Sequence, residues 1–485
     1  METMSDPAAS QSALDWSATI HQGRLLMFPV TSDAERRTLP LLISKRLVCS
    51  LAALVGFVFT VACFFPGYMS PDSISQLEQG RTMSFSAWHP PVMSFLWGLL
   101  DRIVPGPAGM LVFQNIMFWA GLSLFVYYLF ERAGAATAIF LVGFCPPAFA
   151  QLSTIWKDVG MGCSFLLACG LLLSASRRSS KLAWGAAFIP LWYGLSIRHN
   201  AIIAVIPLAI WVAVISRQLF PGKGQSPQVS IALRAALLLA VLVVTSTGVN
   251  KLLASQPSAY PVQQILVHDL VGVSLETNTL YLPEYLTAEL PTSEVGTLKR
   301  LYTPNEVVPL FCCDNNARFE LTSDPTNLSR LWVKWRYTVA HHLRAYLSHR
   351  SRIFRSEFTI GRSTVCLPFW QGIDSNSLNV VFHSTPLNRS VMALLSKVQN
   401  GPLFWGWVYL VLLVVLLCMF WLGVSQDRVA ALLMGLSGLL YALGYFFVST
   451  TCDFRMHWWS VLTVFLLTLL ALARKSKGAR SQALA

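Results

Sequence analysis

Long apolar stretches without charged side chains most limit what this sequence can fold into. The first, 47–65, follows Lys45 and Arg46, and as a helix it is long enough to cross about 30 Å of hydrocarbon. The further stretches are 110–130, 133–150, 159–176, 182–197, 201–216, 235–250, 403–424, 429–449 and 458–473. They predict an all-α polytopic membrane protein with about ten transmembrane helices, within a range of about 8 to 12.

The charge content agrees with a membrane protein and excludes other classes. Charged residues make up 12% and hydrophobic residues 54% of the 485 residues, and the charged share is about half that of a soluble domain. A soluble, disordered, collagen-like or coiled-coil chain is therefore excluded. The net charge of +13 is attributed mainly to Lys and Arg in cytoplasmic loops, and no nucleic-acid partner is expected.

The basic residues alternate between loops, which predicts the topology. Loops on one side of the predicted spans are rich in Lys and Arg, and those on the other side are poor in them, apart from one large domain. This asymmetry places both termini in the cytoplasm. The predicted organisation is a disordered tail (1–44), about seven spans (45–250) with an outer loop (66–109), a mixed soluble outer-face domain (251–402), C-terminal spans (403–473) and a second tail (474–485).

Polar residues that packing does not explain lie at the outer ends of the predicted spans. Four loops that are distant in sequence contribute them, and together they offer acids and cations to one surface. The candidate site residues in these loops are Asp72, Trp88, His89, Lys157, Asp158, Arg198, His199, Asn200, Asp453 and Arg455.

Several of these residues have simpler interpretations. Asp72 follows a proline and could cap a helix, or it could act as a general base whose proton affinity is raised by partial burial. Lys157 and Asp158 could neutralise each other, and Arg198 could be an interfacial anchor. Asp453 and Arg455 could pair with each other in a tight loop.

The later part of the outer domain is basic. Between 330 and 362, Arg344, Arg350 and other cations recur among apolar residues at helical spacing, which predicts a basic amphipathic helix. It could bind anionic lipid head groups or a substrate phosphate. In the same domain, Cys312 or Cys313 could form a disulfide with Cys366 if the compartment is oxidising.

Short motifs in the outer loops resemble those of the GT-C superfamily of membrane glycosyltransferases. The resemblance rests on Pro71-Asp72-Ser73 after the first span, Trp88-His89-Pro90-Pro91 before an apolar helix, Trp156-Lys157-Asp158 in the second outer loop, and Asp453-Phe454-Arg455-Met456 before a late span. It covers the order of loops and spans over most of the chain. His89 replaces a lysine of the family motif, and Ser73 replaces its second acid.

The resemblance implies an enzyme of the bacterial inner membrane that moves a sugar from a polyprenyl-phosphate donor to a saccharide, lipid or protein acceptor on the periplasmic face. Asp72, with Asp158, would be catalytic. The cations would bind phosphate, and His89 would position sugar or phosphate. No cofactor is certain, and a divalent metal is possible. The alternatives are a flippase or exporter of a lipid-linked saccharide and an O-antigen polymerase or ligase.

Overall fold

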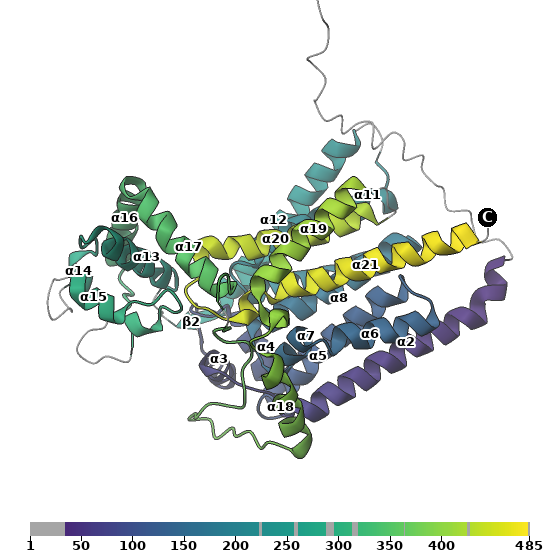
Figure 1. Cartoon of the computed structure of the whole chain (residues 1–485), viewed down its shortest axis with the longest axis horizontal. Helices are drawn as coiled ribbons and strands as arrows, with labels where there is room; N and C mark the ends of the chain where they lie inside the picture. The colour runs from purple at the N-terminus through teal and green to yellow at the C-terminus, as the bar shows by residue number, and fades with distance from the viewer. Residues whose placement is uncertain are drawn as a thin grey trace, which may run out of the picture. The chain divides into compact units, whose positions relative to one another are not determined.

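The computed structural model describes residues 34–222, 226–256, 260–287, 295–312, 319–362, 364–423 and 427–483, and these are mostly helical (Figure 1). Up to residue 256 the elements are α2 (Ala34–Phe64), α3 (Pro71–Thr82), β1 (Phe85–Ser86), α4 (Pro91–Asp101), α5 (Ala108–Tyr127), α6 (Arg132–Gly143), α7 (Pro146–Phe149), η1 (Ala150–Ser153), α8 (Lys157–Arg178), α9 (Lys181–Ala186), α10 (Phe188–Ile197), α11 (Ala201–Leu219), α12 (Pro227–Leu253) and β2 (Ala254–Gln256). The later elements are α13 (Val262–Thr277), α14 (Glu284–Thr287), α15 (Val295–Leu301), η2 (Val308–Leu310), α16 (Pro325–His341), α17 (Leu343–Glu357), α18 (Pro386–Val398), η3 (Pro402–Phe404), α19 (Gly406–Leu422), α20 (Arg428–Val448), η4 (Phe454–His457) and α21 (Trp458–Ala483).

The apolar helices indicate a multi-pass membrane protein. Among the described residues, seven helices are long and apolar enough to span a bilayer, or up to eight if one bent pair counts as a span. That pair, Gly134–Gly143 and Pro146–Ser153, bends by 61° where Pro146 and Pro147 interrupt the helix. The predicted span 182–197 is divided between α9 and α10, and α19 has only 17 residues. The count of about ten spans therefore stays a prediction.

Both predicted tails contain helix. Residues 1–33 of the predicted N-terminal tail lie outside the described residues, but α2 already begins at Ala34. At the other end α21 continues to Ala483, past the predicted boundary at 474. The apolar runs locate the spans but do not mark where the helices end.

Helix α8 lies at the centre of the main core. It packs against α5, α10, α11 and α21. In its most apolar stretch of 18 residues, 83% is buried inside the protein. Small residues allow the close approach to α5, because a Cβ atom on Gly121 would lie 2.7 Å from the backbone of Leu167. This packing fixes the first turn of α8, which carries Lys157 and Asp158.

The segment predicted as an outer domain, 251–402, contributes to two cores. Residues from Leu266 to Leu331 form a separate apolar cluster within the lobe made by α13, α14, α15 and α16 (Figure 1). Phe358, Phe369 and Met392, which come later in the segment, pack into the main core instead. The predicted soluble domain thus has its own core only in its first part.

A disulfide joins Cys366 to Cys452. The expected bridge from Cys312 or Cys313 to Cys366 is therefore wrong. Cys312 is itself disulfide-bonded, and Cys313 lies outside the described residues. Cysteine spacing could not identify the pair because the partners come from loops 86 residues apart.

The outer loop 66–109 contains two packed helices, α3 and α4. They meet at two glycines: a Cβ atom on Gly98 would lie 2.2 Å from the carbonyl oxygen of Gly80. Strand β1 pairs in parallel with β2 at the end of α12 and holds the loop against the bundle. The glycine contact sets the position of α3, whose first turn carries Asp72.

Replacing Gly98 with alanine should destabilise the protein. The added methyl group meets backbone rather than a movable side chain, so overpacking should cost about 1–3 kcal/mol. Thermal unfolding of the purified protein in detergent measures the effect. Gly185→Ala is the matched control, because nothing lies within 4 Å of a Cβ atom at that helical position. Equal melting temperatures for the two variants would contradict the proposed helix contact.

Candidate active site

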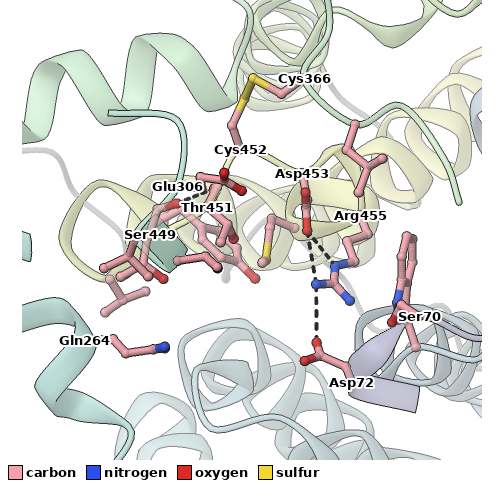
Figure 2. Close-up of a pocket in the computed structure, with 18 of the residues that line it drawn as sticks. Ser70, Asp72, Gln264, Glu306, Cys366, Ser449, Thr451, Cys452, Asp453 and Arg455 are labelled. Atoms are coloured by element: carbon pink, nitrogen blue, oxygen red, sulfur yellow. Dashed lines mark hydrogen bonds and ion pairs between the residues drawn. A yellow bond between two sulfur atoms is a disulfide. The ribbon is translucent and has the colours of Figure 1, made fainter. Parts of the chain in front are cut away.

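One cavity gathers most of the predicted site residues. It has a volume of about 1270 Å³ and lies where the ends of several helices meet loops of the 303–308, 362–370 and 449–456 segments (Figure 2). The predicted residues that line it are Asp72, Trp88, His89, Lys157, Arg198, His199, Asn200, Asp453 and Arg455. Four loops that are distant in sequence therefore meet, as their polar residues predict.

Asp72 is free to face this cavity because other residues cap its helix. Ser70 is the N-cap residue of α3, and its backbone N–H donates to the Ser73 hydroxyl at 3.3 Å. Pro71 starts the helix, where a proline has no hydrogen bond to lose. The Asp72 side chain keeps 36% of its surface exposed. Ser70 and Ser73 therefore cap this helix, and Asp72 does not.

Arg455 connects two acids of the cavity, Asp72 and Asp453. Its Nη2 lies 3.3 Å from Asp72 Oδ2, and both Nη2 and Nε lie 3.0 Å from Asp453 Oδ2. Figure 2 shows Arg455 between the two carboxylates. The guanidinium carbon also lies 4.3 Å from the centre of the Trp156 ring, a cation–π contact. Asp453 and Arg455 do pair, but Arg455 reaches Asp72 as well.

His89 and Lys157 form a second contact beside Asp72. Lys157 Nζ lies 2.6 Å from His89 Nδ1. Burial, and then the nearby Lys157, lower the pKa of His89 to about 3, so the ring is neutral at neutral pH. Since the ammonium donates to Nδ1, the ring proton sits on Nε2, which lies 3.9 Å from Asp72 Oδ1. His89 therefore directs an N–H towards Asp72.

The electrostatics of Asp72 differ from the prediction. Burial alone would raise its pKa, but Lys157, Arg455, His89 and Arg198 outweigh burial and hold the pKa well below its usual range. The expected raised proton affinity of Asp72 is therefore wrong. Asp72 is ionised, and its charge is shared with a cluster of cations.

Asp158 has a different position from the one predicted. Its side chain is only 1% exposed and lies 3.0 Å from Arg198 Nε, and it does not line the cavity. Arg198 also donates to the Tyr445 hydroxyl at 3.1 Å. Asp158 therefore orients Arg198, and a catalytic role for Asp158 is not supported by its position. His199 lines the cavity, and partial desolvation there, followed by the charges of Lys157 and Arg198, lowers its pKa to about 4.

Two predicted phosphate ligands do not line the cavity. Arg344 is exposed, and Arg350 is completely buried in an ion pair with Asp269 at 2.6 Å. Arg350 also donates to the backbone oxygen of Ser449 at 2.8 Å. The predicted amphipathic helix over 330–362 is real but divides at His342 into α16 and α17. Periodicity alone could not show which of its cations face inwards.

The predicted basic stretch 330–362 reaches the cavity at its last cation, Arg362. Other residues of the cavity carried no sequence signal. Trp370 and Thr451 line it, and no motif singled them out. Tyr445 lines it from the end of α20, where an apolar helix gave no reason to select one tyrosine. They could be found only after the loops were placed against each other.

No protein-family model matches this chain, and no curated protein matches it at a significant level. Within the described ranges, no group of three or more His, Cys, Asp or Glu side chains is placed to hold a metal ion. The assignment of a function therefore depends on the charges and geometry of the cavity.

Glu357 is a buried carboxyl group next to this cluster. Its side chain belongs to the last turn of α17 and is 2% exposed. Burial raises its pKa from the ordinary 4.5 to about 8; the Ser449 hydroxyl lowers it, and the charge of Asp453 raises it again. Glu357 is therefore protonated at neutral pH.

This shift predicts how stability varies with pH. Between the ordinary pKa of 4.5 and about 8, the folded protein holds a proton that the unfolded chain has released, so the contribution of Glu357 to stability falls as the pH rises through this window. Glutamine does not titrate, so this contribution should be absent in Glu357→Gln. As the pH rises, the melting temperature of Glu357→Gln should therefore decline less than that of wild type. Melting curves from pH 5 to 9, with the exposed-site variant Glu78→Gln as control, measure it. Parallel curves for Glu357→Gln and wild type would contradict the buried proton.

Proposed function

We propose that this protein is a membrane glycosyltransferase of the GT-C type that transfers a sugar from a polyprenyl-phosphate donor to an acceptor hydroxyl. The observation that carries the proposal is the ionised Asp72 beside Arg455 and Lys157 in one cavity of about 1270 Å³. An acid and several cations at the same place suit a reaction that needs a base and releases a phosphate.

The cations suit the leaving group. Four cations, Lys157, Arg198, Arg362 and Arg455, line the cavity with three acids, Asp72, Glu306 and Asp453. Asp158 balances Arg198 from behind, so an open hydrogen-bond position, rather than net charge, favours an anion. The Arg455 Nη1 atom is enclosed and has no hydrogen-bond partner among the described residues. A phosphate oxygen would supply that partner, and a charge-assisted hydrogen bond of this kind is among the stronger ones.

The proposed reaction is a single displacement at the anomeric carbon. The acceptor oxygen attacks that carbon and forms the new glycosidic bond, and its proton passes to Asp72. The bond from the anomeric carbon to the phosphate oxygen breaks, and the electron pair leaves with polyprenyl phosphate. Arg455, Lys157 and Arg198 stabilise the charge that develops on this oxygen.

The low pKa of Asp72 is compatible with its role as a base. Lys157 and Arg455 hold that pKa down. A bound phosphate would take part of their positive charge, and the pKa of Asp72 would rise towards the value that a base requires. Donor binding would thus prepare the acid for the acceptor proton.

The location follows from the same proposal. The cavity would open at the periplasmic face of a bacterial inner membrane, with both termini in the cytoplasm, as the distribution of Lys and Arg predicts. The acceptor would be a saccharide, lipid or protein that carries a hydroxyl group.

Asp72→Asn should abolish transfer without unfolding the protein. Asparagine keeps the size of the side chain but cannot take the proton, so the rate should fall by about 10²- to 10⁴-fold. The assay supplies purified protein with short-chain citronellyl-phosphate sugars carrying a radiolabel and with membrane extract as the acceptor source. Formation of labelled product and the melting temperature are both measured.

Glu78→Gln is the matched control, because Glu78 lies on the exposed face of the same helix and away from the cavity. It should keep wild-type transfer. Full activity of Asp72→Asn would remove Asp72 from the mechanism. Movement of label across reconstituted bilayers without a new glycosidic bond would instead favour an exporter of lipid-linked saccharide.

A further inference from the structure

Backbone hydrogen bonds connect the segment 367–374 to two loops of the cavity, the one that carries Asp453 and Arg455 and the one that precedes Asp72. The Leu367 carbonyl accepts from the backbone N–H of Phe454 at 3.0 Å, between Asp453 and Arg455. The Gly372 carbonyl accepts from the Met69 N–H at 3.0 Å, three residues before Asp72. One short segment therefore bridges the two loops that supply Asp72 and Asp453.

Further contacts fix the same segment. The Gln151 side chain donates to the Pro368 carbonyl at 2.6 Å, and the Asp374 N–H donates to the Met69 carbonyl at 3.2 Å. The disulfide between Cys366 and Cys452 lies immediately before it. Residues 368–373 are thus held on both sides, and Trp370 lies in the middle of the held stretch.

Trp370 lines the cavity close to Arg455. Its ring centre lies 6.1 Å from that of Trp156, with the planes at 71°, and Trp156 is the ring on which the Arg455 guanidinium lies. Trp156 has a complete set of contacts, since its indole N–H donates to the Ser70 hydroxyl at 2.7 Å. Trp370 is therefore separated from the Arg455 guanidinium by one aromatic ring, that of Trp156.

The indole N–H of Trp370 is enclosed but has no hydrogen-bond partner among the described residues. A buried tryptophan N–H usually finds a partner. Other tryptophans of the chain follow that rule and donate to a carbonyl, hydroxyl or carboxylate oxygen: Trp97, Trp119, Trp156, Trp184, Trp192, Trp335, Trp405, Trp458 and Trp459. Trp370, which lines the cavity, therefore has a hydrogen-bond donor that no other described residue uses.

We propose that Trp370 binds the sugar ring of the donor. Its indole face contacts the apolar C–H face of the ring, and its N–H donates to a hydroxyl or ring oxygen. Because Arg455 lies one aromatic ring away, a phosphate on Arg455 would place the attached sugar against Trp370. This inference depends on the proposed glycosyltransferase function and adds the residue that distinguishes a sugar phosphate from a bare phosphate.

The test compares two ligands that differ only by the sugar. The probes are citronellyl phosphate and a panel of its glucosyl, mannosyl, galactosyl and arabinosyl derivatives, and the dissociation constants are measured by calorimetry on the purified full chain in detergent. Trp370→Phe keeps an aromatic ring but removes the N–H, so it should weaken binding of the best sugar derivative by about threefold to tenfold. Binding of citronellyl phosphate should not change. Trp370→Ala should weaken the sugar derivative further.

Trp405→Phe is the control, because Trp405 donates its N–H to the Asn400 carbonyl and does not line the cavity. An unchanged affinity for citronellyl phosphate shows that the variants keep the cavity intact. Equal weakening of both ligands in Trp370→Phe, or no weakening of either, would overturn the assignment of Trp370.

If the proposed glycosyltransferase function is wrong, the same binding measurements give a different result. Wild type that binds neither ligand, or that binds citronellyl phosphate equally well after Arg455→Met, contradicts the phosphate-binding cavity and, with it, the sugar assignment. Binding of citronellyl phosphate that depends on Arg455 but not on the sugar contradicts the Trp370 inference alone.

Discussion

The placement of one guanidinium group organises the cavity. Arg455 contacts Asp72 and Asp453 and lies over the ring of Trp156. A buried cation of this kind is tolerated because its charge is balanced and its flat face is covered. Its neighbours are placed in turn: Asp72 by the close contact of α3 with α4, and Trp156 by its bond to Ser70. The rest of the cavity wall follows from where this group lies.

The cavity also depends on residues that lie behind its wall. The central helix α8 starts at Lys157, which lines the cavity, and holds Asp158 behind Arg198. Arg350 of α17 fixes the backbone at Ser449. These buried ion pairs place cavity side chains from behind, and their energetic value lies in holding a position more than in adding net stability.

The helical membrane architecture could be predicted from the sequence, and most of the predicted site residues line the cavity, because both depend on local patterns. Uncharged runs identify helices, and polar residues at their ends, such as Asp72, His89 and Arg455, stand out against the apolar background. The incorrect predictions concern which side chains point into the cavity and which residues they contact. Asp158 and Lys157 are adjacent, yet only Lys157 reaches the cavity; Arg350 belongs to a predicted basic face but is buried. The raised pKa expected for Asp72 failed because its neighbours come from distant loops.

The order of the chain gives the Asp72–Arg455 contact a further meaning. These residues are separated by most of the sequence, and Arg455 precedes the last long helix, α21. During synthesis Asp72 emerges several hundred residues before Arg455. The nascent chain therefore carries the acid without this cation until the segment between them has been made, so the ion pair can form only after the helices from α3 to α20 have been synthesised.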